Sequence, residues 1–543
     1  MNVWRLRTHK LEVHRLEQLR LEVRSARKNS TAFPQDHRRF QVQPQSHAVA
    51  TDPSMTARRY TILIALLLVG AIASTLACSC SARTSRPGVQ PQNLLLITVE
   101  GVRADHISAL GYRLPTTGSV RADGGPTYDL DWLAESGVNF SGALAASGDA
   151  RTSLGTILTG ASPLTHGLVT EGRALPADLP TLGADFEAAG FRTAAFVSAS
   201  RSPLTGTGLE RGFETYREFS GDLEALQALA LDARSAAQDG RPGFCWLHLS
   251  GPMHPWSPSS IANAPDFRAP FLADQELGRV REDDEFFAAL RSGSLEPTQA
   301  ERRALIALYD SELLRLNFLV QSAIEAFVGA GGEPNLLERS AVLLVGTNGV
   351  ELGERDGAWL ADGGLHQESL HVPLILRHQA SFTGRRILGG TVEHADIAPT
   401  LRELFGVRAL GAGERSLLAL TDSYVSREFP ARPALALRGD PDGGLSVSVQ
   451  VGNDRLVLAY RQQPQVFGLA ADPSQRHDLT IALEERTQVV CRSAFDALRA
   501  LATHPDLEGD GREYLLRTLH KSAGAPEVAS GERGNASKDS KTH

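Results

Sequence analysis

Lysine is almost missing from the body of this chain. The five lysines are Lys10, Lys28, Lys521, Lys538 and Lys541. None lies between Met55 and His520, so arginine supplies the positive charge over this whole stretch. A site built in this region cannot use a lysine ammonium group to hold an anion.

Cysteine is also scarce. The chain has four cysteines, of which Cys78 and Cys80 are neighbours while Cys245 and Cys491 are far apart. This spacing excludes a disulfide framework and a cysteine-based metal site. Cys245 lies in the apolar run GFCWLHL, where we expect a buried structural thiol.

The chain carries no large excess of charge of one sign. Its formal net charge is -8 at pH 7, and 42% of its residues are hydrophobic and 22% charged. These values are ordinary for a globular protein and do not indicate a nucleic-acid partner. A length of 543 residues suits one large α/β domain together with a smaller one.

Residues 60–77 form an uncharged apolar stretch near the N-terminus, preceded by Arg58 and Arg59. A basic flank, an apolar core and a small-residue exit are the parts of a secretory signal, here over residues 55–80. Because 54 residues come first, we favour translation from Met55, with residues 1–54 not native to the protein. The alternative is a signal-anchor helix with a basic cytoplasmic tail.

The end of this stretch reads Thr75-Leu76-Ala77-Cys78. It is similar to a bacterial lipoprotein cleavage site, except that Thr75 stands where an aliphatic residue is usual. We therefore expect an extracytoplasmic protein attached to the membrane of the cell envelope through Cys78 or through the apolar stretch. Simple cleavage is the alternative. Residues 81–92 are rich in Ser, Arg, Pro and Gln and indicate a linker.

Buried-type strands alternate with helices over residues 93–410. Strands are predicted at 93–100, 192–200, 244–250, 341–348 and 372–377, and helices at 129–137, 150–160, 181–189, 298–327 and 396–406. This alternation predicts an α/β domain with a mainly parallel sheet flanked by helices.

The pattern changes in residues 411–520. Three short segments, 445–451, 454–460 and 465–470, are closely spaced and predict a small antiparallel sheet. A helix is expected to follow near 483–503, which completes a C-terminal subdomain. Residues 521–543 are rich in Gly, Ala, Ser and charge and are predicted to be disordered.

A series of segments carries a family pattern in a fixed order. They are NLLLITVEGVRADHISALGY (93–112), YDLDWLAESGVNFSGALA (128–145), LTGASPLTHG (158–167), LPTLGADFEAAGFRTAAFVSAS (179–200), LERGFETY (209–216), LYDSELLRLNFLVQSAIEAF (308–327), GTNGVELGERDG (346–357), LHQESLHVPLILR (365–377), VEHADIAPTLRELFGV (392–407) and VFGLAADPSQRHDL (466–479). Together they resemble the sulfatases of the alkaline phosphatase superfamily. The resemblance implies an alkaline-phosphatase-like α/β fold with a small C-terminal sheet.

The resemblance also says where the nucleophile should stand. Sulfatases oxidise a Cys or Ser that opens a Cys-x-Pro-Ser-Arg motif, ten residues before the Gly of a Thr-Gly pair. Counting back from Gly160 reaches Ala150, and of the motif only Ser153 matches. Alanine has no atom that can attack an ester. Thr152 is the fallback nucleophile, but it lies two residues further along the helix, rotated by about 200°.

The metal ligands implied by the resemblance are depleted as well. Glu100 stands where the first ligand is an Asp, and Thr347-Asn348 replaces an Asp-His or Asp-Asn pair. Asn348 can coordinate only weakly through its amide oxygen, and Thr347 marks a lost ligand position. One carboxylate makes a poor calcium site. We expect no cofactor, or calcium or another divalent cation if the protein is active.

The cationic clamp around the sulfate is missing too. The family uses lysine where this chain has Ser198, and histidine where it has Met253. The remaining candidates for substrate binding are Arg103 and His254. Arg103 has an equally good structural role as the ion-pair partner of Asp105.

Three hypotheses follow for the function. The first is a pseudoenzyme without the formylglycine nucleophile and most metal ligands, retained for binding or structure, with a sulfated or phosphorylated glycan as partner. The second is an active sulfuric or phosphoric ester hydrolase or phosphotransferase that uses Thr152 or a water, with Glu100 and Asn348 as ligands. The third is an interaction module of the cell envelope that makes no use of the old pocket. We favour the first.

Overall fold

The computed structural model describes most of the region between residues 92 and 479. The described residues are 92–118, 127–169, 171–199, 203–253, 266–329, 336–355, 359–360, 363–382, 386–410, 414–421, 432–440, 444–479 and 496–499. The expected signal, linker and C-terminal tail lie outside them. Within these ranges, no helix combines the length and apolar character needed to cross a membrane.

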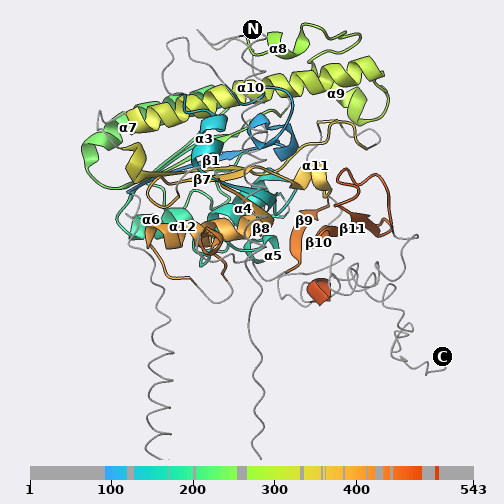
Figure 1. Ribbon diagram of the computed structural model, residues 1–543. Helices are drawn as coiled ribbons and strands as arrows, with labels where there is room; N and C mark the ends of the chain where they lie inside the picture. The colour runs from blue at the N-terminus through green and yellow to red at the C-terminus, as the bar shows by residue number, and fades with distance from the viewer. Residues whose placement is uncertain are drawn as a thin grey trace, which may run out of the picture. The chain divides into compact units, whose positions relative to one another are not determined.

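An eight-stranded sheet forms the centre of the fold (Figure 1). Its strands are β1 (Asn93–Val99), β2 (Val138–Leu144), β3 (Arg192–Ser198), β4 (Thr215–Phe219), β5 (Gly243–Leu249), β6 (Ser340–Gly346), β7 (Leu374–Arg377) and β8 (Arg386–Glu393). The order across the sheet is β4-β3-β5-β1-β6-β7-β2-β8. β7 runs antiparallel to both of its neighbours, and every other pair is parallel. The mainly parallel sheet is thus confirmed.

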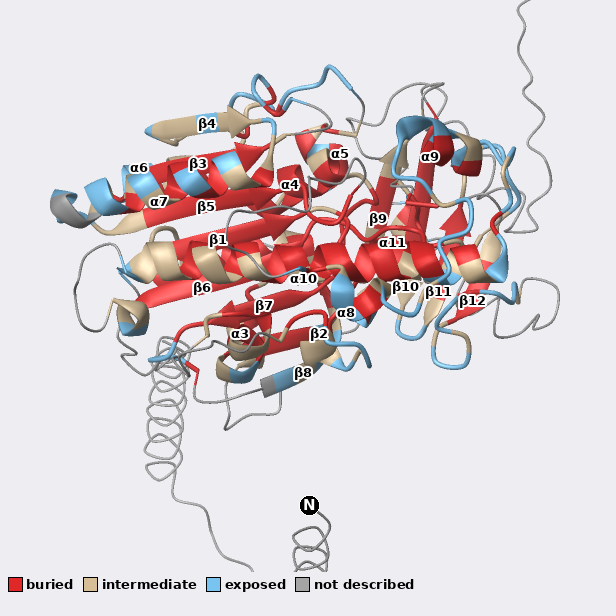
Figure 2. Ribbon diagram, turned by 90° about the horizontal axis from the view of Figure 1, so that it is seen from above, coloured by how far each residue is buried: buried red, intermediate tan, exposed pale blue. Residues whose placement is uncertain are grey.

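Helices cover both faces of this sheet, as Figure 1 shows. Among them are α4 (Ala150–Thr159), α6 (Leu182–Ala188) and α12 (Ile397–Phe405) on one face, and α7 (Asp222–Asp239) and α10 (Gln299–Gly329) on the other. The remaining helices are α3 (Leu130–Ser136), α5 (Pro163–His166), α8 (Ala269–Leu272), α9 (Asp284–Arg291) and α11 (Gln367–Leu370). The central strands are therefore buried on both sides, which explains their continuous apolar runs (Figure 2).

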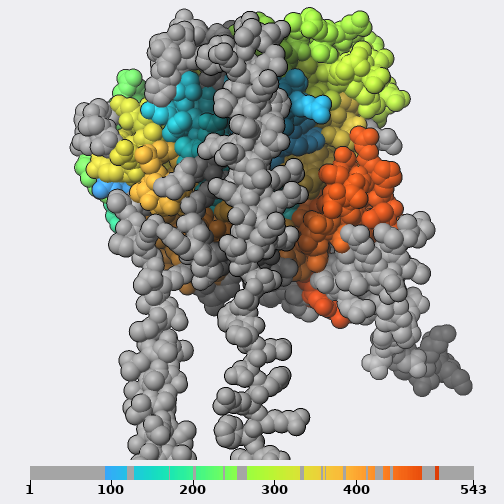
Figure 3. Space-filling view, viewed as in Figure 1, coloured from blue at the N-terminus to red at the C-terminus, as the bar shows by residue number. Residues whose placement is uncertain are grey.

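A second sheet lies in the C-terminal part of the described chain. It is fully antiparallel in the order β12-β11-β10-β9, with β9 at Ala434–Gly439, β10 at Leu445–Val451, β11 at Asp454–Leu458 and β12 at Gln465–Gly468. The three predicted strands are confirmed, and β9 adds a fourth. Figure 3 shows residues of this sheet, in orange, at the surface of the protein. The helix expected over 483–503 falls outside the described residues apart from 496–499, which are helical.

The register of the large sheet brings three strand ends to one edge. Val99 at the end of β1 pairs with Leu249 of β5 on one side and with Gly346 of β6 on the other. The residues that follow, among them Glu100 and Thr347, therefore emerge side by side. The carboxyl edge of a parallel sheet is where α/β proteins place their ligand sites.

Candidate active site

Helix α4 begins at the position expected for a nucleophile. Ala150 is its first residue, and Asp149 is the N-cap whose carboxylate accepts a hydrogen bond from Thr152 N at 2.8 Å. A helix N-terminus attracts anions through its free N–H groups and its dipole. Here the chain's own carboxylate occupies that position, and the methyl group of Ala150 offers no reactive atom.

Thr152 is held inside the protein. Its side chain is 1% exposed, and its hydroxyl lies 2.7 Å from both Asp149 Oδ1 and the carbonyl oxygen of Leu168. Both neighbours are acceptors, so the single hydroxyl proton is shared between them. These bonds fix the loop after α5 to the first turn of α4, which is a structural use of the side chain.

His166 packs beneath the same helix. Its Nε2 lies 3.0 Å from Thr156 Oγ1, and its Nδ1 accepts a hydrogen bond from Leu168 N at 3.1 Å. Gly155 permits this approach, because a Cβ there would lie 2.8 Å from the ring. Burial lowers the pKa of His166 to about 4, so the ring is neutral at physiological pH.

Glu100 is engaged by a histidine from the neighbouring strand. Its Oε1 lies 3.1 Å from His248 Nε2, and His248 Nδ1 lies 2.8 Å from Thr98 Oγ1, which also accepts from Trp246 Nε1 at 2.9 Å. The network is satisfied when Thr98 donates to Nδ1 and His248 donates to Glu100. The carboxylate expected to bind a cation thus already has a partner.

The amide oxygen of Asn348 has hydrogen-bond partners within the protein. Oδ1 accepts from Thr347 Oγ1 at 2.8 Å and from Gly101 N at 3.4 Å, while Nδ2 donates to Gly349 O at 3.0 Å. Thr347 and Asn348 are 0% and 1% exposed. Thr347 Oγ1 also lies 3.2 Å from Val99 O, so its single proton is shared between that oxygen and Asn348 Oδ1.

Buried apolar and hydroxyl groups fill the positions where the resemblance places a sulfate clamp. Met253 is 3% exposed and packs over Gly101, so closely that a Cβ at Gly101 would lie 2.3 Å from its sulfur. Ser198 Oγ lies 2.8 Å from Ser250 Oγ, and both residues are buried. The other substrate-binding candidate next to Met253, His254, lies outside the described residues.

Arg103 is committed to ion pairs. It is 6% exposed and donates from Nε and Nη2 to the carboxylate of Asp105 at 3.0 and 2.8 Å, and from Nη1 to Glu354 and to Val350 O. Burial opposes its charge, but Asp105 and Glu354 outweigh burial and raise the pKa of Arg103. The same pairing lowers the pKa of Asp105 to about 2 against the effect of burial.

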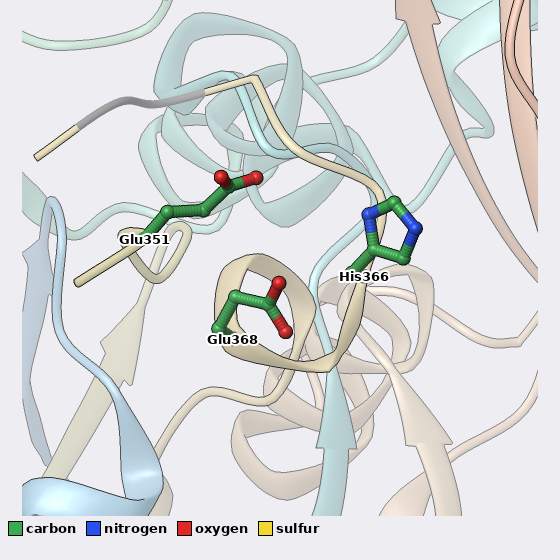
Figure 4. A group of neighbouring side chains, drawn as sticks. All are labelled: Glu351, His366 and Glu368. Carbon is green, nitrogen blue, oxygen red and sulfur yellow. The ribbon is translucent and has the colours of Figure 1, made fainter. Parts of the chain in front are cut away.

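A second group of polar side chains lies near the same edge and was not found from the sequence. Glu351 follows β6, His366 precedes α11 and Glu368 lies in α11, and their ligand atoms are within 4.8 Å of one another (Figure 4). Burial and the charge of Glu368 raise the pKa of Glu351 to about 7. Fourteen intervening residues separate Glu351 from His366, so no short motif could mark this group.

Comparison with known proteins places this geometry in a family. A family model described as Sulfatase matches residues 92–407, which is more than half of the chain. A comparison of this chain with curated protein sequences found no match.

Solved structures with the same fold are distant in sequence. BT4656, in complex with its substrate D-glucosamine-2-N,6-O-disulfate, is 16% identical, with a TM-score of 0.57 over 77% of this chain and 100% of that chain. The phosphonate monoester hydrolase of Agrobacterium radiobacter is 16% identical, with a TM-score of 0.58 over 76% and 96%. Ps i-CgsB in complex with k-i-k-neocarrahexaose is 16% identical, with a TM-score of 0.56 over 81% and 98%. Because the family model matches more than half of the chain and the fold agrees with it, this chain belongs to the sulfatase family of the alkaline phosphatase superfamily.

Proposed function

We propose that this sulfatase-family chain is a pseudoenzyme, retained for binding or for a structural role rather than for ester hydrolysis. The observation that carries the proposal is the start of α4, where Ala150 holds the nucleophile position and Asp149 caps the helix. Attack on a sulfate ester needs a nucleophilic oxygen at this point and N–H groups free to hold the anion. Ala150 supplies no such oxygen, and Asp149 takes the N–H group of Thr152.

The surroundings of Glu100 support the same proposal. A cation that polarises an ester oxygen needs several oxygen ligands with free lone pairs. Asn348 Oδ1 already accepts two hydrogen bonds, and Glu100 pairs with His248. Binding calcium here requires breaking these bonds, and of Glu100, Thr347 and Asn348 only Glu100 carries a carboxylate.

An active hydrolase that uses Thr152 is the competing proposal. Its hydroxyl bonds Asp149, a carboxylate that could take up a proton as a base does. However, the same hydroxyl also bonds Leu168 O, and the side chain is 1% exposed. A substrate can reach it only after α4 and the loop at Leu168 separate, which makes the pseudoenzyme the better proposal.

The partner that we propose for a binding role is a sulfated or phosphorylated glycan. The support comes from structures with a similar fold: one is solved with a disulfated glucosamine and another with a neocarrahexaose. Calorimetric titration with a sulfated oligosaccharide and with its desulfated counterpart tests this. Binding that requires the sulfate groups supports the glycan partner. No binding of either leaves an interaction or structural module of the envelope.

We further propose an extracytoplasmic location with attachment to the membrane. The support is the apolar stretch at residues 60–77 and the cysteine that follows it, Cys78. Fractionation of cells that express the wild type and Cys78→Ala is the test. Membrane recovery of the wild type and loss of it in the variant support lipid attachment. Recovery of both in the cytoplasm contradicts the proposal.

Hydrolysis itself is tested by incubating the purified chain with aryl sulfates and aryl phosphates in the presence of calcium. The proposal predicts rates equal to those of buffer. Metal-dependent turnover that Thr152→Ala abolishes would establish the competing hydrolase.

A further inference from the structure

We propose that Glu351, His366 and Glu368 form a binding site for a divalent cation of the zinc type, built from other residues than those at the family's metal position. The site goes beyond the proposed function, since it needs neither the nucleophile position nor Glu100. One imidazole and two carboxylates are ligands that zinc takes, and three protein ligands leave a fourth position open.

The three side chains converge. Figure 4 shows the carboxylates of Glu351 and Glu368 and one ring nitrogen of His366 turned toward a shared space. Their ligand atoms lie within 4.8 Å of one another. Ligands of a tetrahedral zinc ion, at about 2.0–2.2 Å from the metal, are roughly 3.3–3.5 Å apart. Closing the difference takes a movement of about 1 Å, which rotation of two glutamate side chains provides.

The group leaves buried polar atoms without hydrogen bonds. Glu368 Oε1 and Ser369 Oγ are buried and have no hydrogen-bond partner among the described residues. His366 Nε2 has none either, but the ring nitrogen turned toward the carboxylates in Figure 4 is the other one, Nδ1. Glu368 and Ser369 are 5% and 0% exposed. Buried polar atoms normally find partners, because leaving them unpaired is costly. The unpaired carboxylate oxygen of Glu368 is an acceptor that a bound cation satisfies.

A glycine lets two side chains of this group approach the backbone closely. A Cβ built at Gly364 would lie 2.3 Å from Ser369 Oγ and 2.6 Å from Glu351 Oε1. Any side chain there would press into the glutamate. The neighbouring Gly363 N donates to Gly148 O at 2.8 Å, which fixes this loop to the residues just before α4. The close approach of Ser369 and Glu351 is therefore made to a loop that is itself anchored.

Nearby arginines compete with a cation for the carboxylates. Arg355 Nε lies 2.7 Å from Glu368 Oε1, yet neither atom has the geometry of a hydrogen bond. Arg455 is buried, and burial lowers its pKa to about 10. In the proposed site, the two carboxylates that contact the ion offset the repulsion between the ion and the arginines.

The test is calorimetric titration of Zn²⁺ into the untagged, chelator-treated full chain. We expect one zinc site, whose affinity Glu351→Gln and His366→Asn each lower by about 100-fold or more. Even the mutation of a residue that only orients a metal ligand typically lowers the metal affinity by about 10–100-fold. Glu100→Gln is the matched control, because it removes a carboxylate at the family's metal position and should change the affinity by less than about twofold.

Circular dichroism of each variant in chelator establishes that it is folded, and Glu351→Gln keeps the side-chain shape. Absence of zinc binding, or binding that both variants leave unchanged, overturns the site, and a shared proton then explains the two glutamates. That result would leave the argument from Ala150 untouched. Conversely, zinc-dependent ester turnover would overturn the pseudoenzyme and leave the metal site standing.

Discussion

Met253 lies directly against Gly101, in the space that any side chain at position 101 would need. A Cβ there would lie 2.3 Å from Met253 Sδ and 2.7 Å from Met253 Cγ, and the backbone of Gly101 has a φ of +66°. The resemblance to sulfatases implies a second Asp at this position in many members, although one branch of the family lacks it. The loss of that ligand is therefore built into the packing around the old site, and one substitution cannot reverse it.

Gly101→Ala should lower the free energy of unfolding by about 2–4 kcal/mol, from the clash with Met253 and the left-handed backbone. In a Met253→Ala background the same substitution should cost only about 1–2 kcal/mol, which is the backbone part. Urea denaturation of the four proteins measures this coupling. Equal costs in both backgrounds would show that Met253 does not fill the position.

Calcium should not stabilise the protein through Glu100. Asn348 Oδ1 is already taken and Thr347 supplies no charge, so linkage to a bound ion contributes little. Thermal unfolding of the chelator-treated protein, after removal of the chelator, should give melting temperatures within about 1 °C with and without millimolar calcium, because a site far from saturation adds almost nothing. A marked rise with calcium that Glu100→Ala removes would contradict this reading of the site.

Much of the architecture was predictable because its signals are local. The apolar run NLLLITV predicts β1, and the helix predicted at 150–160 is observed as α4 (Ala150–Thr159). Ala150 itself was found by counting back from Gly160. The division into domains at residue 410, by contrast, stays a prediction.

The partners of the site residues could not be predicted in the same way. His248 and Glu100 are 148 residues apart, and Asn348 and Gly101 are 247 apart. Only the register of β1 with β5 and β6 brings these pairs together. The sequence also does not predict the group of Glu351, His366 and Glu368, because the path of a loop brings these residues together and no short motif marks them.

His166 should make the protein less stable in acid. Its folded-state pKa of about 4 lies below the ordinary value of 6.5, so below pH 6.5 the unfolded chain takes up the proton first. The stability is present above pH 6.5 and falls toward pH 4, by at most about 3 kcal/mol from this residue. Urea denaturation between pH 8 and 4 should show a shallower fall for His166→Asn. An unchanged slope would contradict the neutral, buried ring.

Thr152→Val should destabilise the protein without affecting any catalytic step. It keeps the volume of the side chain but leaves Leu168 O without its partner, at a cost of about 1–3 kcal/mol. Thr165→Val is the matched control, because the Thr165 hydroxyl is exposed and bonds only Ser162, and it should cost within about 0.5 kcal/mol. Equal effects of the two substitutions on the free energy of unfolding would show that the buried hydrogen bonds of Thr152 do not stabilise the protein.

Rebuilding the active site should be strongly non-additive. Ala150→Cys alone should give no activity, because Thr152 and Leu154 replace the Pro and Arg of the motif that the resemblance implies. Activity should appear only when the whole motif is rebuilt and Thr347→Asp and Ser198→Lys are added in the same protein. The effects of residues that act as a unit are not additive, because the loss of one already removes most of the activity. Turnover from Ala150→Cys alone, followed with an aryl sulfate, would contradict this.

The most direct measurement of the central claim is ester turnover by the purified wild-type chain, with divalent cation present, beside Thr152→Ala. The account predicts that neither protein hydrolyses aryl sulfates or aryl phosphates above the rate in buffer, since Ala150 has no attacking atom and Asp149 occupies the helix start. Metal-dependent turnover by the wild type that Thr152→Ala abolishes would contradict it, and would mean that the chain has moved its nucleophile rather than lost it.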